Sequence, residues 1–139
     1  MTGFPVTIRF PMHWGEMDAL GHANNTRYFA WFESARIAYF KRVGLRSDAP
    51  SPVGPILKRA DCEFLKPLRW PAELIAGARV TALGNTSFTM EYALALAESP
   101  DEPAARGTAV VVVVNYETGQ KTPIPANIRS EIEALEDRT

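Results

Sequence analysis

The sequence is poor in the residues that build disulfides and metal centres. It contains a single cysteine, Cys62, and two histidines among 139 residues. One cysteine excludes an internal disulfide and any metal site with several cysteine ligands, and it suits a reducing compartment. We therefore expect a cytoplasmic protein without a metal site.

The sequence also lacks an excess of charge and a long hydrophobic run. Lysine and arginine (15) nearly balance aspartate and glutamate (16), and no five like charges follow one another. No segment is long and apolar enough to span a membrane, and Arg9 and Glu16 interrupt the stretch where a signal peptide would be apolar. These features argue against nucleic-acid and membrane partners and favour a small molecule or a second copy of the chain.

Internal repeats, low-complexity tracts and domain linkers are absent as well. Hydrophobic residues make up 46% of the chain, which is enough to bury one core. We therefore expect residues 1–139 to form a single domain.

Residues 24–43 predict one long helix. This stretch contains neither glycine nor proline, its aromatic residues recur at helical spacing, and Gly44 follows as a stop. Most of its circumference is apolar, so the helix must be largely enclosed. Glu33 and Arg36 are three residues apart and are expected to pair with each other or to lie at a subunit interface or site rim.

The rest of the chain has the pattern of strands separated by turns, which indicates an antiparallel sheet. The expected strands are 6–10, 56–65, 74–83, 88–97 and 107–116, and a short helix is expected at 127–135. Large and small residues lie on opposite faces of 88–97, so we expect a helix to contact one of them. The run Val110–Val114 has no polar residue and fits a strand that is covered on both sides.

One segment carries a specific motif. His13 to Tyr28 reads HWGEMDALGHANNTRY, and a Phe64-x-x-Pro67 corner follows later. The segment resembles the 4-hydroxybenzoyl-CoA thioesterase family, in which an aspartate precedes a Gly-His-x-Asn-Asn-x-x-Tyr stretch leading into the helix. The resemblance implies an α+β hot-dog fold, with an antiparallel β-sheet wrapped around one long central α-helix. It also implies an acyl-CoA thioesterase that needs no cofactor.

The resemblance implies a role for each residue of the motif. Asp18 is expected to be the nucleophile that attacks the thioester carbonyl, or the base that activates water. The backbone N–H of Asn25 is the expected oxyanion donor, because early helical N–H groups have no intrahelical partner. His22 is expected to orient water or Asp18, or to assist proton transfer to the leaving thiolate. The expected substrate-binding residues are Gly21, Asn24, Tyr28 and Glu33.

Each assignment has a structural alternative. A loop aspartate, a hydrogen-bonding histidine and two capping asparagines would explain the motif without chemistry. Glu16 is a second carboxylate near the motif and is expected to be an exposed loop acid. Cys62 alternates with apolar neighbours and is expected to be a small core residue.

The group that carries the acyl chain is left open by one departure from the family pattern. In some relatives the turn that corresponds to Leu83–Phe88 holds the CoA phosphates, but here it contains no cation. The phosphates must then be bound by a partner subunit or elsewhere on the chain, where the candidates are Lys58, Arg59, Lys66 and Arg69. Acyl carrier protein is the alternative carrier.

Two other functions fit part of the pattern. A hot-dog hydratase uses an aspartate and a histidine on a similar scaffold, and a non-catalytic acyl-CoA-binding module would keep the fold without turnover. In every case, a single sheet around one helix leaves apolar surface and a free edge. We therefore expect a homodimer or homotetramer with the site formed between subunits.

Overall fold

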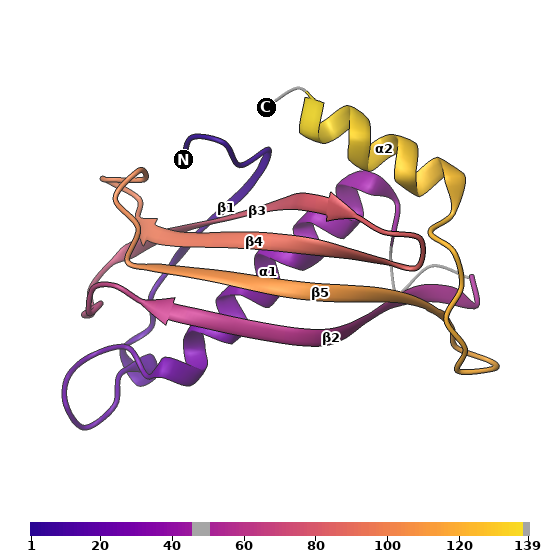
Figure 1. Cartoon of the computed structure of the whole chain (residues 1–139). Helices are drawn as coiled ribbons and strands as arrows, with labels where there is room; N and C mark the ends of the chain where they lie inside the picture. Colours follow the sequence, from indigo (N-terminus) through magenta and orange to yellow (C-terminus); the bar gives the residue numbers. More distant parts are fainter. Residues whose placement is uncertain (46–50, 138–139) are drawn as a thin grey trace.

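The computed structural model describes residues 1–45 and 51–137, which form a five-stranded sheet with two α-helices (Figure 1). The elements in chain order are β1 (Val6–Pro11), the short 3-10 helix η1 (Trp14–Glu16), α1 (Asn25–Val43), β2 (Val53–Phe64), β3 (Glu73–Leu83), β4 (Ser87–Leu96), β5 (Ala105–Asn115) and α2 (Ala126–Asp137). The strands lie in the order β1-β3-β4-β5-β2, and every neighbouring pair is antiparallel.

Local sequence signals set the length of α1. The side chain of Asn24 caps the first turn by accepting a hydrogen bond from the Thr26 N–H at 2.9 Å. The last turn carries Lys41 and Arg42, which favour the negative end of the helix dipole, and Gly44 ends the helix with a φ of 81°. The predicted helix of residues 24–43 is therefore confirmed, with its first residue acting as the cap.

α1 crosses one face of the sheet and covers the core (Figure 1). It packs most closely on β1 and β3. Phe32 stacks on Tyr92 of β4 with ring centroids 5.1 Å apart, and Phe40 meets Phe88 edge-on at 6.2 Å. This arrangement of an antiparallel sheet around one long helix is the hot-dog fold, as predicted.

The helix contacts the face of β4 that carries its large side chains. Those side chains are Phe88, Met90, Tyr92 and Leu94, and all four belong to the core beneath α1. These large side chains reach between the side chains of α1 and fill the core. The small residues Ala93 and Ala95 are buried on the opposite face.

The valine run of β5 is buried on both faces of the sheet, as predicted. Val111 and Val113 belong to the core beneath α1, while Val112 and Val114 lie on the other face and are each only 4% exposed. The polar residues of β5 are placed closer to its ends, so this strand contributes apolar surface to both layers.

Strand β2 begins at Val53, earlier than the predicted residue 56, because Gly54 and Pro55 extend it instead of breaking it. A Cβ at Gly54 would lie 2.5 Å from the Tyr116 hydroxyl, so a larger residue would force that ring to shift. The same hydroxyl donates to the Pro55 carbonyl at 2.6 Å. Proline is tolerated because β2 is an edge strand.

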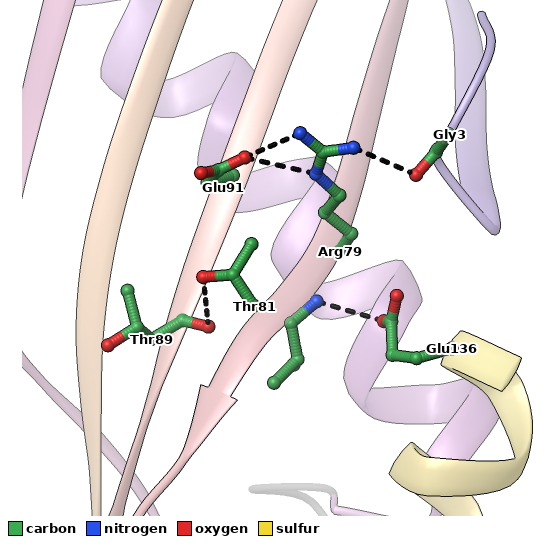
Figure 2. Close-up of polar contacts among 7 residues, drawn as sticks. Gly3, Arg79, Thr81, Thr89, Glu91 and Glu136 are labelled. Atoms are coloured by element: carbon green, nitrogen blue, oxygen red, sulfur yellow. Dashed lines mark hydrogen bonds and ion pairs between the residues drawn. The ribbon is translucent and has the colours of Figure 1, made fainter. Parts of the chain in front are cut away.

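The sheet face opposite α1 carries polar cross-strand pairs. Figure 2 shows Arg79 of β3 donating two hydrogen bonds to Glu91 of β4, at 3.0 and 2.6 Å. Its third bond goes to the Gly3 carbonyl at 3.3 Å and ties the N-terminal segment to the sheet (Figure 2).

The carboxylate of Glu136 helps to anchor helix α2. Glu136 accepts a hydrogen bond from the Val80 N–H at 2.9 Å, at the irregular point of β3 (Figure 2). It also accepts the hydroxyl proton of Tyr39, which is fully buried in α1. The apolar stripe of α2 packs on the core through Ile128, Ile132 and Leu135, as the sequence predicts.

The β2 edge leaves apolar side chains in contact with solvent. Ile56 and Leu57 on this strand are each 46% exposed, and Phe29 and Ile37 on the adjacent side of α1 are 42% and 40% exposed. Within residues 1–45 and 51–137, neither helix combines the length and apolar character that a bilayer crossing requires.

Candidate active site

The loop between η1 and α1 folds back on itself and is held by backbone hydrogen bonds. Met17 and Ala23 form an isolated antiparallel bridge, and the Asp18 N–H donates to the His22 carbonyl at 2.9 Å. Gly21 sits at the tip with a φ of 79°, a conformation that other residues adopt only with strain. The loop therefore holds Asp18 and His22 opposite each other at its base.

The carboxylate of Asp18 is exposed and only half engaged. Its Oδ1 accepts a hydrogen bond from the Leu20 N–H at 2.9 Å, which fixes the orientation of the side chain. In the described part of the chain, no donor binds Oδ2. One carboxylate oxygen is therefore free to meet a ligand.

The first turn of α1 presents an unused backbone donor. Asn24 accepts from the N–H of Thr26 at 2.9 Å and from its hydroxyl at 2.8 Å, and its carbonyl accepts from the Arg27 N–H at 2.9 Å. Among residues 1–45 and 51–137, the N–H of Asn25 finds no acceptor, and Asn25 is exposed. A free N–H at the positive end of a helix is suited to bind an oxyanion.

Asp18 and Asn25 border the same hollow. Its volume is about 480 Å³, and it is lined by Asp18, His22, Ala23, Asn25, Tyr28, Phe64, Leu65, Lys66 and Pro67. Four of the seven predicted site residues are thus gathered around one space. Gly21 and Asn24 shape the loop and the cap beside it, whereas Glu33 lies further along α1 in a different hollow.

Tyr28 forms the inner wall of this hollow. It is 3% exposed, and its ring meets Phe64 edge-on with centroids 4.9 Å apart. Burial, and to a smaller degree the neighbouring Cys62, raises the pKa of the Tyr28 hydroxyl above its ordinary value of 10.0. The phenol is therefore neutral at physiological pH and keeps its proton for donation.

His22 is held by a cation that the motif does not contain. The Nη2 atom of Arg69 lies 3.0 Å from Nε2 of His22. A guanidinium can only donate, so Nε2 accepts and the imidazole proton is assigned to Nδ1. This contact joins residues 22 and 69, which are far apart in sequence, and no sequence pattern pointed to it.

Glu16 is a structural residue of the loop. Its Oε1 accepts from the His13 N–H at 2.6 Å, and its Oε2 accepts from the indole N–H of Trp31 at 3.1 Å. Its backbone carbonyl accepts from the Asn24 N–H at 2.8 Å. Glu16 is consequently partly buried, where an exposed loop acid was expected, and both of its carboxylate oxygens are engaged.

Glu33 and Arg36 do pair, as one of the expectations had it. Arg36 Nη2 lies 3.7 Å from Glu33 Oε2, and the two side chains line a hollow of about 280 Å³ between α1 and β2. The walls are mainly apolar and include Phe29, Phe32 and Leu57. This hollow lies one helical turn beyond the one that contains Asp18.

The four cations expected to bind CoA phosphates differ in whether they reach the Asp18 hollow. Lys66 lines the Asp18 hollow and pairs with Glu102 at 3.7 Å, and Arg69 reaches the hollow through His22. Lys58 and Arg59 are exposed on β2, at its irregular point and away from the Asp18 hollow.

Cys62 packs against the core from β2, and it is partly buried. Burial and the charge of Asp61 raise the pKa of its thiol to about 11. Among residues 1–45 and 51–137, no three side chains of His, Cys, Asp or Glu gather closely enough to hold a metal ion.

Comparison with known proteins identifies relatives over most of the chain. The sequence model of the thioesterase-like superfamily matches residues 12–132. The protein YsmA of Bacillus subtilis strain 168 is 30% identical over 120 residues, which cover 86% of this chain and 79% of YsmA.

Solved structures extend the likeness to the fold. PA5185 of Pseudomonas aeruginosa PAO1 is 30% identical with a TM-score of 0.86, and the match covers 96% of this chain and 92% of PA5185. A thioesterase of Thermus thermophilus, whose crystal structure contains coenzyme A and zinc, is 33% identical with a TM-score of 0.84. That match covers 100% of this chain and 99% of the Thermus chain.

Proposed function

The chain belongs to the thioesterase-like superfamily, and we propose that it hydrolyses an acyl-CoA thioester to a free acid and CoA, with Asp18 as the reactive carboxylate. The observation that carries the proposal is the pairing of two unused groups at one hollow. The free oxygen of Asp18 supplies a nucleophile or base, and the free N–H of Asn25 supplies an oxyanion donor.

The chemistry can follow two routes from this geometry. As a nucleophile, Asp18 adds to the thioester carbonyl, the C–S bond breaks, and water then hydrolyses the mixed anhydride. As a general base, Asp18 takes a proton from a water that adds to the same carbonyl. In both routes the Asn25 N–H stabilises the tetrahedral oxyanion, and the sulfur leaves as the thiol after gaining one proton.

His22 and Tyr28 are proposed to serve proton transfer and substrate positioning. With Nε2 held by Arg69, Nδ1–H is the remaining donor of His22, and its proposed partner is Asp18, water or the departing thiolate. The buried phenol of Tyr28 remains protonated and can donate to the substrate. Glu33 would contact the acyl group beyond them, in the neighbouring hollow.

CoA is the proposed carrier of the acyl group. The related thioesterase of Thermus thermophilus was crystallised with coenzyme A, which supports a CoA-type ligand for this chain. Of the four candidate cations, Lys66 lines the Asp18 hollow and Arg69 contacts His22 at that hollow, so we assign the CoA phosphates to them rather than to Lys58 and Arg59. The single free cysteine fits a cytoplasmic setting for the reaction.

The protein is proposed to work as a homodimer or homotetramer, with the site between subunits. The exposed apolar side chains of β2 and α1 lie on one side of the molecule, beside an edge strand with unpaired backbone groups. A second copy placed there would cover this surface and close the open side of both hollows. Light scattering at micromolar concentration should give at least a dimer, and a monomer would remove the shared-site model.

A thiol-release screen over acyl-CoA thioesters tests the function. Release of CoA thiol together with the free acid is the expected result, from short, medium, long or aromatic acyl groups. Loss of an enoyl-CoA by water addition without thiol release would instead identify a hydratase. Tight binding of acyl-CoA with no turnover on any substrate, including acyl carrier protein thioesters, would identify a binding module.

A further inference from the structure

Arg36 is a buried cation with most of its donors unused. Its side chain is 10% exposed, and Nη1 donates to the Tyr92 hydroxyl at 3.2 Å. The contact of Nη2 with Glu33, at 3.7 Å, is too long for a hydrogen bond. A guanidinium carries five N–H groups. Among residues 1–45 and 51–137 no fully buried side-chain nitrogen lacks a partner, so the N–H groups of Arg36 without a protein acceptor are open to water.

The unused donors face a space with the dimensions of a ligand site. Arg36 lines both the hollow of about 280 Å³ and an adjoining one of about 150 Å³, which lie between α1 and β2. The other side chains that meet this space are mainly apolar, such as Phe29 and Leu57, but the larger hollow is also lined by Asp61 and Thr108. Both carboxylate oxygens of Asp61 accept hydrogen bonds from Thr108, one from its N–H and one from its hydroxyl. An anion that enters this space would replace the water at these N–H groups and form charge-assisted hydrogen bonds with the guanidinium.

Glu33 is not the anion that binds these N–H groups of Arg36. Its side chain is 67% exposed, so its charge is screened by water and its distance to Arg36 remains long. The side chain can turn into solvent and leave the guanidinium to a ligand. A carboxylate that approaches through the hollow could instead accept two parallel N–H bonds.

The location relative to Asn25 suggests what that ligand is. Arg36 lies three helical turns beyond Asn25 on α1, which is about 16 Å of rise. Its side chain leans back toward the helix N-terminus, as helical side chains do, so the guanidinium lies closer than that to the thioester carbonyl. An acyl group held at Asp18 and directed along α1 would reach Arg36 with a chain of medium length.

We propose, on the basis of the thioesterase function above, that the hollow between α1 and β2 receives the distal end of the acyl group. Arg36 selects medium-length acyl chains that end in a carboxylate. A terminal methyl group would displace water from the guanidinium without replacing its hydrogen bonds, whereas a terminal carboxylate pairs with it. Sites built around a buried polar group discriminate strongly against analogues that lack the matching group.

Matched pairs of substrates test the proposal on the unmodified protein. Values of kcat/KM are compared for succinyl-, adipoyl- and suberoyl-CoA against butanoyl-, hexanoyl- and octanoyl-CoA. We expect the carboxyl-terminated member to be favoured by at least about tenfold for adipoyl or suberoyl, and less for succinyl, which is too short. Equal values, or a preference for the methyl-terminated chains, would overturn the proposal while leaving the thioesterase function intact. Absence of thiol release from all six would instead count against both.

Variants at Arg36 assign the preference to this residue. Arg36→Met should reduce the ratio of carboxyl- to methyl-terminated kcat/KM by at least about tenfold, mainly through KM, and Arg36→Lys should retain part of it. Glu33→Gln should raise the ratio, because it removes the competing carboxylate. Arg106→Met, an exposed cation on the opposite face of the sheet, is the matched control and should leave the ratio unchanged. If Arg36→Met does not fold, Arg36→Lys and Glu33→Gln still decide, and a ratio that neither variant moves would refute the role of Arg36.

Discussion

The two ends of α1 use carboxylates in opposite ways. Near the C-terminal end, Glu136 accepts the Tyr39 hydroxyl and the Val80 N–H, and this bonding fixes α2 to the sheet. Near the N-terminal end, Asp18 has an oxygen that no donor among residues 1–45 and 51–137 binds, next to the unused N–H of Asn25. The difference separates groups that stabilise the fold from groups left available for a ligand.

Glu16 sharpens this comparison because it lies only two residues before Asp18. Both of its carboxylate oxygens accept hydrogen bonds from the protein, one of them from the indole of Trp31. Like Glu136, it accepts two hydrogen bonds from the protein, although it is a neighbour of Asp18. Proximity to the motif therefore does not predict chemistry. The carboxylate of Asp18 differs from both glutamates because it is exposed, borders the hollow and accepts one hydrogen bond rather than two.

The largest expected effect is on turnover at Asp18. Asp18→Asn keeps the shape and removes the charge, so kcat should fall at least about a hundredfold, which is about 2.7 kcal/mol of transition-state stabilisation. The melting temperature should stay near that of the parent, because the side chain is exposed and makes one hydrogen bond. Asp101→Asn, at another exposed aspartate that does not line the hollow, is the control in a thiol-release assay. Near-parental turnover in Asp18→Asn would refute the assignment.

The next effect separates Glu16 from Asp18. In Glu16, one carboxylate oxygen accepts the His13 N–H and the other accepts the Trp31 indole N–H. Glu16→Gln replaces one of these oxygens with an NH2 group, which donates and cannot accept, so one of the two bonds is lost. We expect a loss of about 2 kcal/mol in the free energy of unfolding, measured by urea denaturation, with a smaller loss of kcat than in Asp18→Asn. If Glu16→Gln abolishes turnover at unchanged stability, the reactive carboxylate is Glu16.

A smaller effect is expected at the other end of α1. Tyr39 and Val80 donate to the same oxygen of Glu136, so Glu136→Gln keeps an oxygen that can accept both bonds but loses the charge that strengthens them. The melting temperature should fall by roughly 3–8 °C, which corresponds to about 1 kcal/mol. The value of kcat measured well below the melting transition should be unchanged. A drop in kcat there would show that α2 supports the site.

Much of the fold could be predicted from the sequence because its signals are local. Asn24 and Gly44 delimit α1, and the valine run of β5 indicates burial on both faces. The start of β2 was missed because Gly54 and Pro55 normally break strands. Here the packing of Tyr116 over Gly54, which is a tertiary contact, makes them part of the edge strand.

The site was predictable only in part for the same reason. The motif located Asp18, His22, Asn25 and Tyr28, which the loop and the first turn of α1 bring to one hollow. The contacts of Arg69 with His22 and of Glu16 with Trp31 join distant segments, and no periodicity or spacing encodes them. The separation of Glu33 from the Asp18 hollow likewise depends on where β2 passes α1.

The smallest expected effect concerns Cys62 of β2, which packs against the core and whose thiol we expect to be unreactive. Burial and the charge of Asp61 raise the pKa of its thiol to about 11, so the reactive thiolate is scarce at neutral pH. The raised pKa also means that folding favours the neutral thiol. This contribution to stability is present below about pH 9 and is lost as pH rises toward 11.

Because the thiolate is scarce, iodoacetamide should modify native Cys62 slowly and the urea-unfolded chain much faster. Cys62→Ala should keep kcat within about twofold, because no step of the proposed chemistry uses the thiol. Rapid modification of the native protein together with loss of turnover would indicate that the sulfur takes part in the reaction.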